Sequence, residues 1–163
     1  MLPLEAGAAR NPILFLGTAF DELHGQLSPD GHWMAYTSDE SGRREVYVRP
    51  FPAAEGQWKI SIAGGEQPRW RGDGKELFFE AADGQMTAVP VTAVAGPQPH
   101  FAAGSPQALF GARLALTENG APFQYDVTAD GKRFLIDAAG SDSPRQSTPS
   151  LTVMVNWNPG PRH

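Results

Sequence analysis

Cysteine is absent from this chain of 163 residues, and strongly basic clusters and long apolar runs are missing too. Without cysteine, disulfides, thiolate nucleophiles and cysteine-based zinc sites are excluded, while the cellular compartment stays open. A formal net charge of −5 argues against a nucleic-acid partner, and a solvated hairpin end explains Arg43-Arg44 better than a phosphate site. No segment is apolar for long enough to span a membrane, and residues 1–11, with Glu5 and Arg10, do not read as a secretory signal.

Glycine and proline are abundant instead, with 18 and 15 residues, and hydrophobic residues make up 40% of the chain. This composition excludes a disordered chain and lacks the period of collagen. No long segment has the 3.6-residue periodicity of an amphipathic helix. We therefore expect an all-β fold with many turns.

One short sequence motif recurs three times, and each copy has Asp-Gly between an apolar residue and an apolar run. The three aspartates are spaced 43 and 57 residues apart. A period of about 40 residues built on strands and Asp-Gly turns predicts β-propeller blades. The aspartates themselves are predicted to cap backbone N–H groups in the turns rather than to form a carboxylate cluster. The copies are Leu27–Tyr36, Trp70–Phe79 and Val127–Ile136, with Asp30, Asp73 and Asp130 in the turns.

Each repeat is predicted to hold antiparallel strands in the same order. A short strand precedes Asp-Gly, and a strand with the apolar run follows it. A third strand alternates polar and apolar residues, and a fourth strand ends the first two repeats. Pro50, Pro52 and Pro90 are expected to end or edge strands, because proline cannot donate to a ladder. The predicted strands are 25–28, 33–37, 45–49 and 57–62, then 67–70, 76–80, 85–89 and 107–110, then 124–127, 133–137 and 151–157.

Two segments interrupt the period, and the two ends of the chain complement each other. We expect Thr92–Pro106 to be a loop between strands and Ala138–Pro149, rich in serine and proline, to be mobile. Ile13–Gly17 reads as a lone fourth strand, which the last repeat lacks. The predicted organisation is an extension over residues 1–12, three four-stranded blades over 13–157, and a tail over 158–163.

The first repeat resembles those of TolB-like, WD-repeat-like β-propellers, through Ser28-Pro29-Asp30-Gly31 and Trp33–Asp39. Three further segments are similar in sequence to propeller regions at the C-terminal end of certain bacterial serine/threonine protein kinases. They are Val46–Pro52, Gly65–Trp70 and Val155-Asn156-Trp157. That resemblance implies a sensing or protein-interaction domain. Such propellers normally have more than three blades, so the chain resembles either the end of a longer protein or a short relative that assembles.

Candidate chemistry is sparse. The four histidines are scattered, and Asp39-Glu40-Ser41-Gly42 lacks the ligand spacing of a calcium loop, so we predict no metal site and no cofactor. No Gly-x-Ser-x-Gly elbow or phosphate-binding loop occurs, and Gly64-Gly65 fits a tight turn. Most aromatic residues lie on predicted strands and are expected to pack between sheets rather than to form a sugar-stacking platform. The histidines are His24, His32, His100 and His163, and the aromatic residues are Trp33, Tyr36, Tyr47, Trp58, Trp70, Phe78, Phe79, Phe134 and Trp157.

Three functions remain open at this point. The leading prediction is a binding or scaffolding propeller module without catalytic residues, whose ligand lies on the turn-lined face or in a central channel. The alternative is a propeller hydrolase or lyase with carboxylates at the channel mouth, supplied by Asp39, Glu40, Glu66 and Glu80. The third is an incomplete propeller that self-associates.

Assembly is predicted from the blade count. Because closed propellers need four to eight blades, we expect a homodimer of six blades in which residues 13–17 pair with 151–157 of the partner. A monomeric fragment of a longer propeller is the other possibility.

Overall fold

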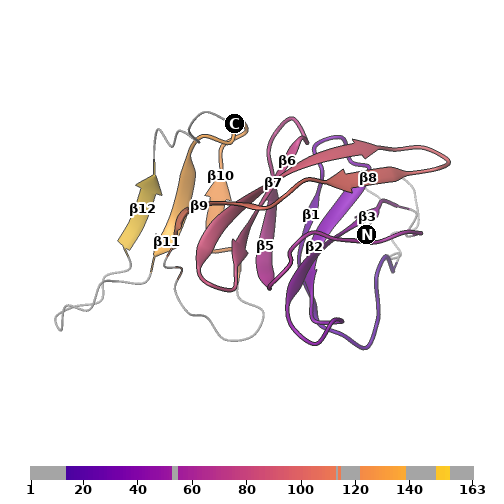
Figure 1. Ribbon diagram of the computed structural model, residues 1–163, viewed down its shortest axis with the longest axis horizontal. Coiled ribbons are helices and arrows are strands. Elements are labelled where there is room, and N and C mark those ends of the chain that lie inside the picture. The colour runs from indigo at the N-terminus through magenta and orange to yellow at the C-terminus, as the bar shows by residue number, and fades with distance from the viewer. Residues whose placement is uncertain (1–13, 53–54, 113, 115–121, 139–149, 155–163) are drawn as a thin grey trace, which may run out of the picture.

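The computed structural model describes residues 14–52, 55–112, 114, 122–138 and 150–154. These residues form twelve strands in three antiparallel sheets and no helix, which confirms the all-β prediction (Figure 1). No helix capable of crossing a membrane occurs in this part of the chain. We number the sheets 1, 2 and 3 in chain order.

The strands follow the predicted order within each sheet. Sheet 1 runs β1-β2-β3-β4, sheet 2 runs β5-β6-β7-β8 with β9 also paired to β7, and sheet 3 runs β10-β11-β12. Their bounds are β1 Glu22–Leu27, β2 Trp33–Ser38, β3 Glu45–Pro50, β4 Trp58–Lys59, β5 Gly65–Trp70, β6 Glu76–Ala81, β7 Gln85–Val94, β8 His100–Ala103, β9 Gln107–Gly111, β10 Tyr125–Val127, β11 Phe134–Ala138 and β12 Ser150–Met154.

The three Asp-Gly turns have the same geometry. Gly31, Gly74 and Gly131 have φ angles of 73°, 71° and 71°, a left-handed conformation that glycine adopts without strain. In each turn the aspartate before the glycine accepts a hydrogen bond from the backbone N–H two residues further on, at 3.0–3.1 Å. The turn-capping interpretation of the three aspartates is therefore confirmed.

Sheets 1 and 2 pack face to face through a buried apolar layer, which we call the aromatic layer after Trp33, Trp58, Trp70, Phe79 and Phe101. Trp33 of β2 lies 5.6 Å from the ring of Trp58 and 5.2 Å from that of Phe101. Leu77 and Phe79 of β6 belong to the same buried cluster. The predicted packing between sheets is thus confirmed for these aromatic residues. Tyr36 and Tyr47 instead stack on each other within sheet 1, with ring centroids 5.8 Å apart, and Trp157 lies outside the described residues.

The segment Thr92–Pro106 is not a loop, and this prediction was wrong. Strand β7 continues to Val94 and pairs with β8, from Val91↔Ala103 to Val94↔His100. The hairpin carries Phe101, only 3% exposed, into the aromatic layer between sheets 1 and 2. Small residues in these strands hid the alternation that usually marks a strand.

Pro90 does not end a strand either. It lies inside β7, where the pairing with β6 ends and the pairing with β8 begins. The missing N–H of proline is tolerated there, because the ladder changes partner at that point.

Sheets 2 and 3 pack through a smaller buried cluster. Phe134, fully buried, lies 5.2 Å from the rings of both Phe78 and Phe110. Hydrogen bonds reinforce this interface: Tyr125 Oη donates to the carbonyl of Gln67 at 2.7 Å, and the Gly72 N–H donates to the carbonyl of Ala129 at 2.9 Å. Gly72 has no room for a side chain, since a Cβ would lie 2.8 Å from that of Ala129.

The ends of the predicted propeller region differ from expectation. Residues 14–17 form no strand, and the ring of Phe15 lies 5.1 Å from that of Phe51 beside sheet 1. Figure 1 shows β12 at the opposite end of the molecule. The predicted fourth strand over residues 57–62 is reduced to Trp58–Lys59. The predicted mobile segment, from residue 139 on, and residues 155–157 lie outside the described residues.

Candidate functional site

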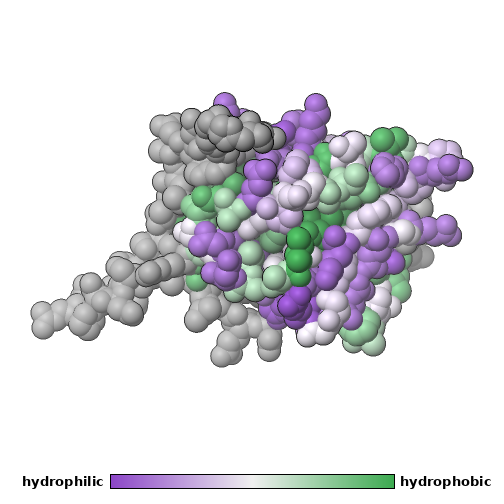
Figure 2. Space-filling model, viewed as in Figure 1, coloured by the Kyte–Doolittle hydropathy of each residue, from purple (hydrophilic) through white to green (hydrophobic). Residues whose placement is uncertain are grey.

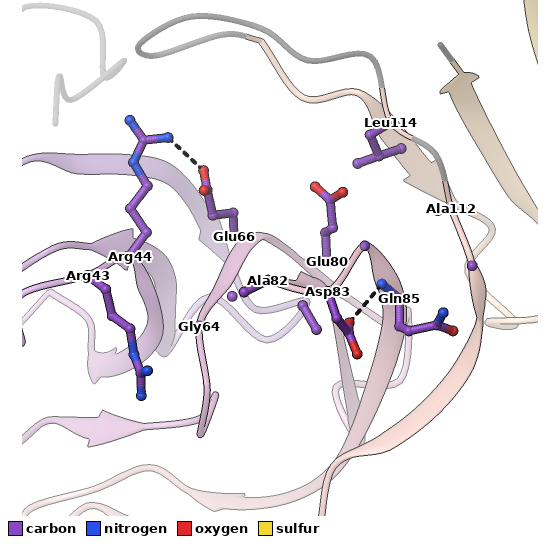
Figure 3. Close-up of a pocket in the computed structure, with 14 residues that line it drawn as sticks. Arg43, Arg44, Gly64, Glu66, Glu80, Ala82, Asp83, Gln85, Ala112 and Leu114 are labelled. Carbon is purple, nitrogen blue, oxygen red and sulfur yellow. Dashed lines mark hydrogen bonds and ion pairs between the residues drawn. The ribbon is translucent and has the colours of Figure 1, made fainter. Parts of the chain in front are cut away.

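Two of the four predicted carboxylates meet in one pocket. Glu66 of β5 and Glu80 of β6 are direct cross-strand partners, and both line a cavity of about 930 Å³. Figure 3 shows their carboxyl groups beside each other, with Leu114 on the far side of Glu80. We call this cavity the turn pocket, and its charged and apolar walls include Arg43, Arg44, Glu66, Glu80, Asp83 and Leu114.

Asp39 and Glu40 do not belong to this pocket. Asp39 Oδ1 accepts a hydrogen bond from the Asp21 N–H at 3.0 Å, and Glu40 binds the side-chain amide of Gln57. The four carboxylates named from the sequence are therefore not brought together. Glu66 and Glu80 line the turn pocket, and Asp39 and Glu40 do not.

The turn pocket is assembled from turns that follow different strands. Arg43 and Arg44 come from the β2–β3 turn, Gly64 precedes β5, and Asp83 lies in the β6–β7 turn. Gly64 and Ala82 lie between these charged groups, and a Cβ at Gly64 would lie 2.7 Å from that of Ala82, so the start of β5 lies tightly against the β6–β7 turn. The Gly65 N–H also donates to the carbonyl of Arg44 at 3.1 Å, so the pocket depends on the close approach of sheets 1 and 2.

The two glutamates have different electrostatic environments. Glu66 Oε2 accepts a hydrogen bond from Arg44 Nη1 at 2.9 Å, in an ion pair whose side chains are about one-third exposed. Burial raises the pKa of Glu80 to about 7, and repulsion from Glu66 adds to the effect. Near neutral pH, Glu80 therefore exchanges between its acid and carboxylate forms.

Glu45 binds two residues of the pocket wall, Arg43 and Gly64, and it was not identified from the sequence. Its buried carboxylate accepts hydrogen bonds from Arg43 Nε at 2.8 Å and from the Gly64 N–H at 2.9 Å, and it also binds Ser61. Burial pushes the pKa of Glu45 upward, but these hydrogen bonds outweigh it and hold the pKa below its ordinary value. Its place in an alternating strand gives no signal of this role, because Ser61 and Gly64 lie 16 and 19 residues further along the chain.

A second polar cluster joins the first strands of the three sheets. Arg69 Nη1 donates to Gln26 Oε1 at 3.0 Å, and Arg69 Nε lies 3.7 Å from Asp126 Oδ1. We call Gln26, Arg69 and Asp126 the inner-edge row. The ring of Phe123 lies under the Arg69 guanidinium, 3.7 Å from Cζ to the ring centroid.

The inner-edge row follows the spacing of the repeat. Its members are 43 and 57 residues apart, as the turn aspartates are. The same offsets relate His24, Gln67 and Gln124, of which His24 and Gln67 have φ angles of 54° and 57° at irregularities in β1 and β5. Gln67 and Gln124 exchange hydrogen bonds at 3.0 and 2.7 Å. Applying the repeat spacing to neighbouring positions was the signal that could have found these residues.

The histidines contribute no common site. Among the described residues, no three His, Asp or Glu side chains come together in a way that could hold a metal ion. His24 contacts the ring of Phe123 at 5.1 Å, and His163 lies outside the described residues. The absence of a metal or cofactor stays a prediction.

Comparison with known proteins finds a solved structure of low similarity to this chain. No family model and no curated protein matches the sequence. Among solved structures, the crystal structure of TolB from Acinetobacter baumannii is similar with a TM-score of 0.41 and 17% sequence identity. The match covers 87% of this chain and 45% of the TolB chain, so the chain spans less than half of that protein. This similarity is too low to assign a function or to fix the number of blades.

Proposed function

We propose that this chain is a non-catalytic binding module of the β-propeller type, which holds its partner in the turn pocket. One observation carries the proposal: the pocket gathers Arg44, Glu66 and Glu80 from separate elements and leaves them accessible. Its volume of about 930 Å³ is within the range of ligand sites. Binding residues commonly lie on loops that a rigid scaffold positions.

The chemistry of the pocket favours a cationic side chain of a protein or peptide. Arg43 and Arg44 are already paired with Glu45 and Glu66. Within the described residues, Glu80 has no ion-pair partner, and Asp83 adds a second negative charge. A lysine or arginine side chain of the partner would pair with Glu80 and favour its ionised form.

This proposal is tested by calorimetry with a short arginine-containing peptide and an acidic peptide of the same length. We expect the arginine peptide to bind more tightly at pH 8 than at pH 5.5, because Glu80 must lose its proton. Binding near pH 7 should release a fraction of a proton, measured by comparing buffers of different ionisation enthalpy.

Glu80→Gln should weaken this binding about tenfold and remove its pH dependence, as expected for the loss of one partly buried charge pair. Glu55→Gln is the matched control, because Glu55 is exposed and does not line the pocket. Equal binding of both peptides, or an unchanged affinity in Glu80→Gln, contradicts the proposal.

A hydrolase or lyase is the second candidate, favoured by the shared pocket of Glu66 and Glu80 and by the raised pKa of Glu80. Two observations argue against an enzyme. Glu66 already forms an ion pair with Arg44, and no His, Ser or Thr is among the described residues that line the pocket. Glycoside hydrolysis with a panel of chromogenic sugars tests this candidate. Turnover that is lost in both Glu66→Gln and Glu80→Gln would establish it.

We further propose that each of the three sheets is one propeller blade and that two chains close a ring of six. Sheet 2 buries both of its faces, against sheets 1 and 3, whereas Leu135 of sheet 3 is 41% exposed. A second chain would cover such outer faces, and each Å² of apolar surface removed from water contributes about 25 cal/mol.

Light scattering tests the dimer, with an expected mass of twice the 17.5 kDa of one chain. A mass of one chain at micromolar concentration rejects it and supports a fragment of a longer propeller. Exchange of residues 13–17 would require this segment to leave Phe51 and become a strand. A dimer that persists after deletion of residues 1–18 rejects that exchange.

A sensor role is the finer form of the proposal. It rests on the resemblance of Val46–Pro52 to kinase-linked propellers. It predicts that ligand binding in the turn pocket changes the oligomeric state, which the same light-scattering measurement with the arginine peptide would detect.

A further inference from the structure

An exposed leucine of sheet 3 breaks the burial pattern of the repeat. Leu135 of β11 is 41% exposed. The offsets of 43 and 57 residues relate it to Ala35 and Phe78, which are almost fully buried. Each of those two residues belongs to the cluster that joins its sheet to the following one. Leu135 therefore marks a face of sheet 3 against which no other sheet of the described residues packs.

A leucine of sheet 1 breaks the pattern in the opposite direction. Leu27 of β1 is 46% exposed, whereas its equivalents Trp70 and Val127 pack against the sheet that precedes theirs. Leu27 is the cross-strand partner of Met34, which is half-buried. Further along the same face, Tyr36 is already buried within its own chain. The open part of this face is therefore the region around Leu27 and Met34.

The packed interface between sheets 2 and 3 indicates which surface fits this region. There, Phe78 contacts Phe134, with ring centroids 5.2 Å apart. The repeat spacing relates Phe78 to Leu135. It also relates Phe134 to Met34, through the two offsets together. A contact between Leu135 of one chain and Met34 of another would therefore repeat a contact that this chain already makes.

The two ends of the inner-edge row complement each other in the same way. Asp126 is 67% exposed, and its contacts with Arg69 and with the Val127 N–H both involve Oδ1, so Oδ2 is open among the described residues. Gln26 Nε2 donates to the carbonyl of Gly25 at 3.1 Å. Because an amide nitrogen carries two hydrogens, a second donor remains. A carboxylate at one end of the row thus matches an amide N–H at the other.

We propose that sheet 3 of one chain binds sheet 1 of a second copy of this chain through these residues. Leu135 packs on Leu27 and Met34 of the second copy, and Asp126 Oδ2 accepts a hydrogen bond from Gln26 Nε2. A second copy fits better than an unrelated protein, because each open end carries the apolar and polar groups that match the other. This inference rests on the proposed ring of six blades and names the contacts that close it. Twofold symmetry forms the interface twice.

Cross-linking with a short bis-maleimide tests the contact, since the chain has no cysteine of its own. Leu135→Cys and Leu27→Cys chains are co-expressed with different tags. We expect a linked product that contains one chain of each kind. Neither variant alone should give a linked product, because the two copies of one residue lie at separate interfaces of the ring. Val94→Cys, at an exposed position of β7, is the matched control in place of Leu135→Cys and should not link to Leu27→Cys.

Leu135→Glu is the second test, measured by light scattering over a dilution series. It should raise the dissociation constant of the dimer roughly a hundredfold, because one apolar contact is lost at both interfaces. Val94→Glu should leave the constant unchanged. A native chain with the mass of one copy rejects the proposed ring together with this interface. A native dimer that links Leu135→Cys only to itself, or that is unaffected by Leu135→Glu, rejects this interface alone.

Discussion

Sheet 2 uses its two faces differently. Towards sheet 1 it presents Leu77 and Phe79 to an aromatic layer that the β7–β8 hairpin completes with Phe101. Towards sheet 3 it presents Phe78 to a smaller cluster and adds hydrogen bonds from Gln67 and Gly72. Apolar contact is tolerant of small shifts, whereas hydrogen bonds fix distance and direction. We infer that the first interface supplies most of the stability and the second fixes the position of sheet 3.

The largest effect is expected from Phe101→Ala, which removes the aromatic group between Trp33, Trp58 and Trp70. Loss of a buried phenylalanine typically lowers the free energy of unfolding by about 3–5 kcal/mol. Urea unfolding measures the loss, and hydrogen exchange should show β2 and β3 opening before β11. Val94→Ala in the same hairpin is the control, because Val94 is 56% exposed. Equal losses in the two variants would show that the hairpin packs loosely.

Gln67→Met should affect the other interface with a smaller magnitude. It removes the amide that bonds both the backbone N–H and the side chain of Gln124. Lost hydrogen bonds at a buried site lower the free energy of unfolding by about 1–3 kcal/mol. We expect faster exchange of amides in β10 and β11 with little change in β2. Gln107→Met, at an exposed position of β9, should change neither.

Glu80→Gln tests the turn pocket through the pH dependence of the free energy of unfolding. Because the pKa of Glu80 is raised from 4.5 to about 7, its contribution to stability is present below pH 4.5 and is lost as pH rises through 7. The variant should therefore be more stable than the native chain at pH 8, by about 1–2 kcal/mol after allowing for solvent screening of a half-buried group. At pH 4 the two should unfold alike. A difference independent of pH would contradict the assigned pKa.

The smallest effect is expected from Arg44→Met, which breaks the partly exposed pair with Glu66. Such pairs contribute about 0.2–1 kcal/mol, and salt screens them. Thermal unfolding should show a small loss at low salt that vanishes in 1 M sodium chloride. A loss that persists in high salt would mean that the aliphatic stem of Arg44 packs in the pocket.

The repeat explains why much of this fold could be predicted. The Asp-Gly turns and the alternating strands after them depend on local sequence, and the structure has them at the expected places. The β7–β8 hairpin could not be predicted in the same way. Its strands consist largely of small residues, and the burial of Phe101 depends on tryptophans from 31 to 68 residues away in the chain.

The candidate site was predicted only in part. Glu66 and Glu80 were named as carboxylates, but their pairing depends on the register of β5 with β6, which includes an irregularity between Glu66 and Arg69. Arg43 and Arg44 were assigned to a solvated hairpin end; they lie there, with the Arg43 side chain 57% exposed, and they also pair with Glu45 and Glu66. The Arg44–Glu66 pair depends on the distance between sheets 1 and 2, which no single-repeat pattern contains.

The inner-edge row has a consequence for the ancestry and redesign of such chains. Repeats that arise by duplication begin with identical residues at equivalent positions, yet here those positions hold Gln26, Arg69 and Asp126. A chain built from copies of the second repeat alone would set arginine against arginine where Arg69 now meets an amide on one side and a carboxylate on the other. The three repeats are therefore no longer interchangeable. Arg69 of the second repeat pairs with Gln26 of the first and Asp126 of the third, so these contacts form only when the repeats stand in this order.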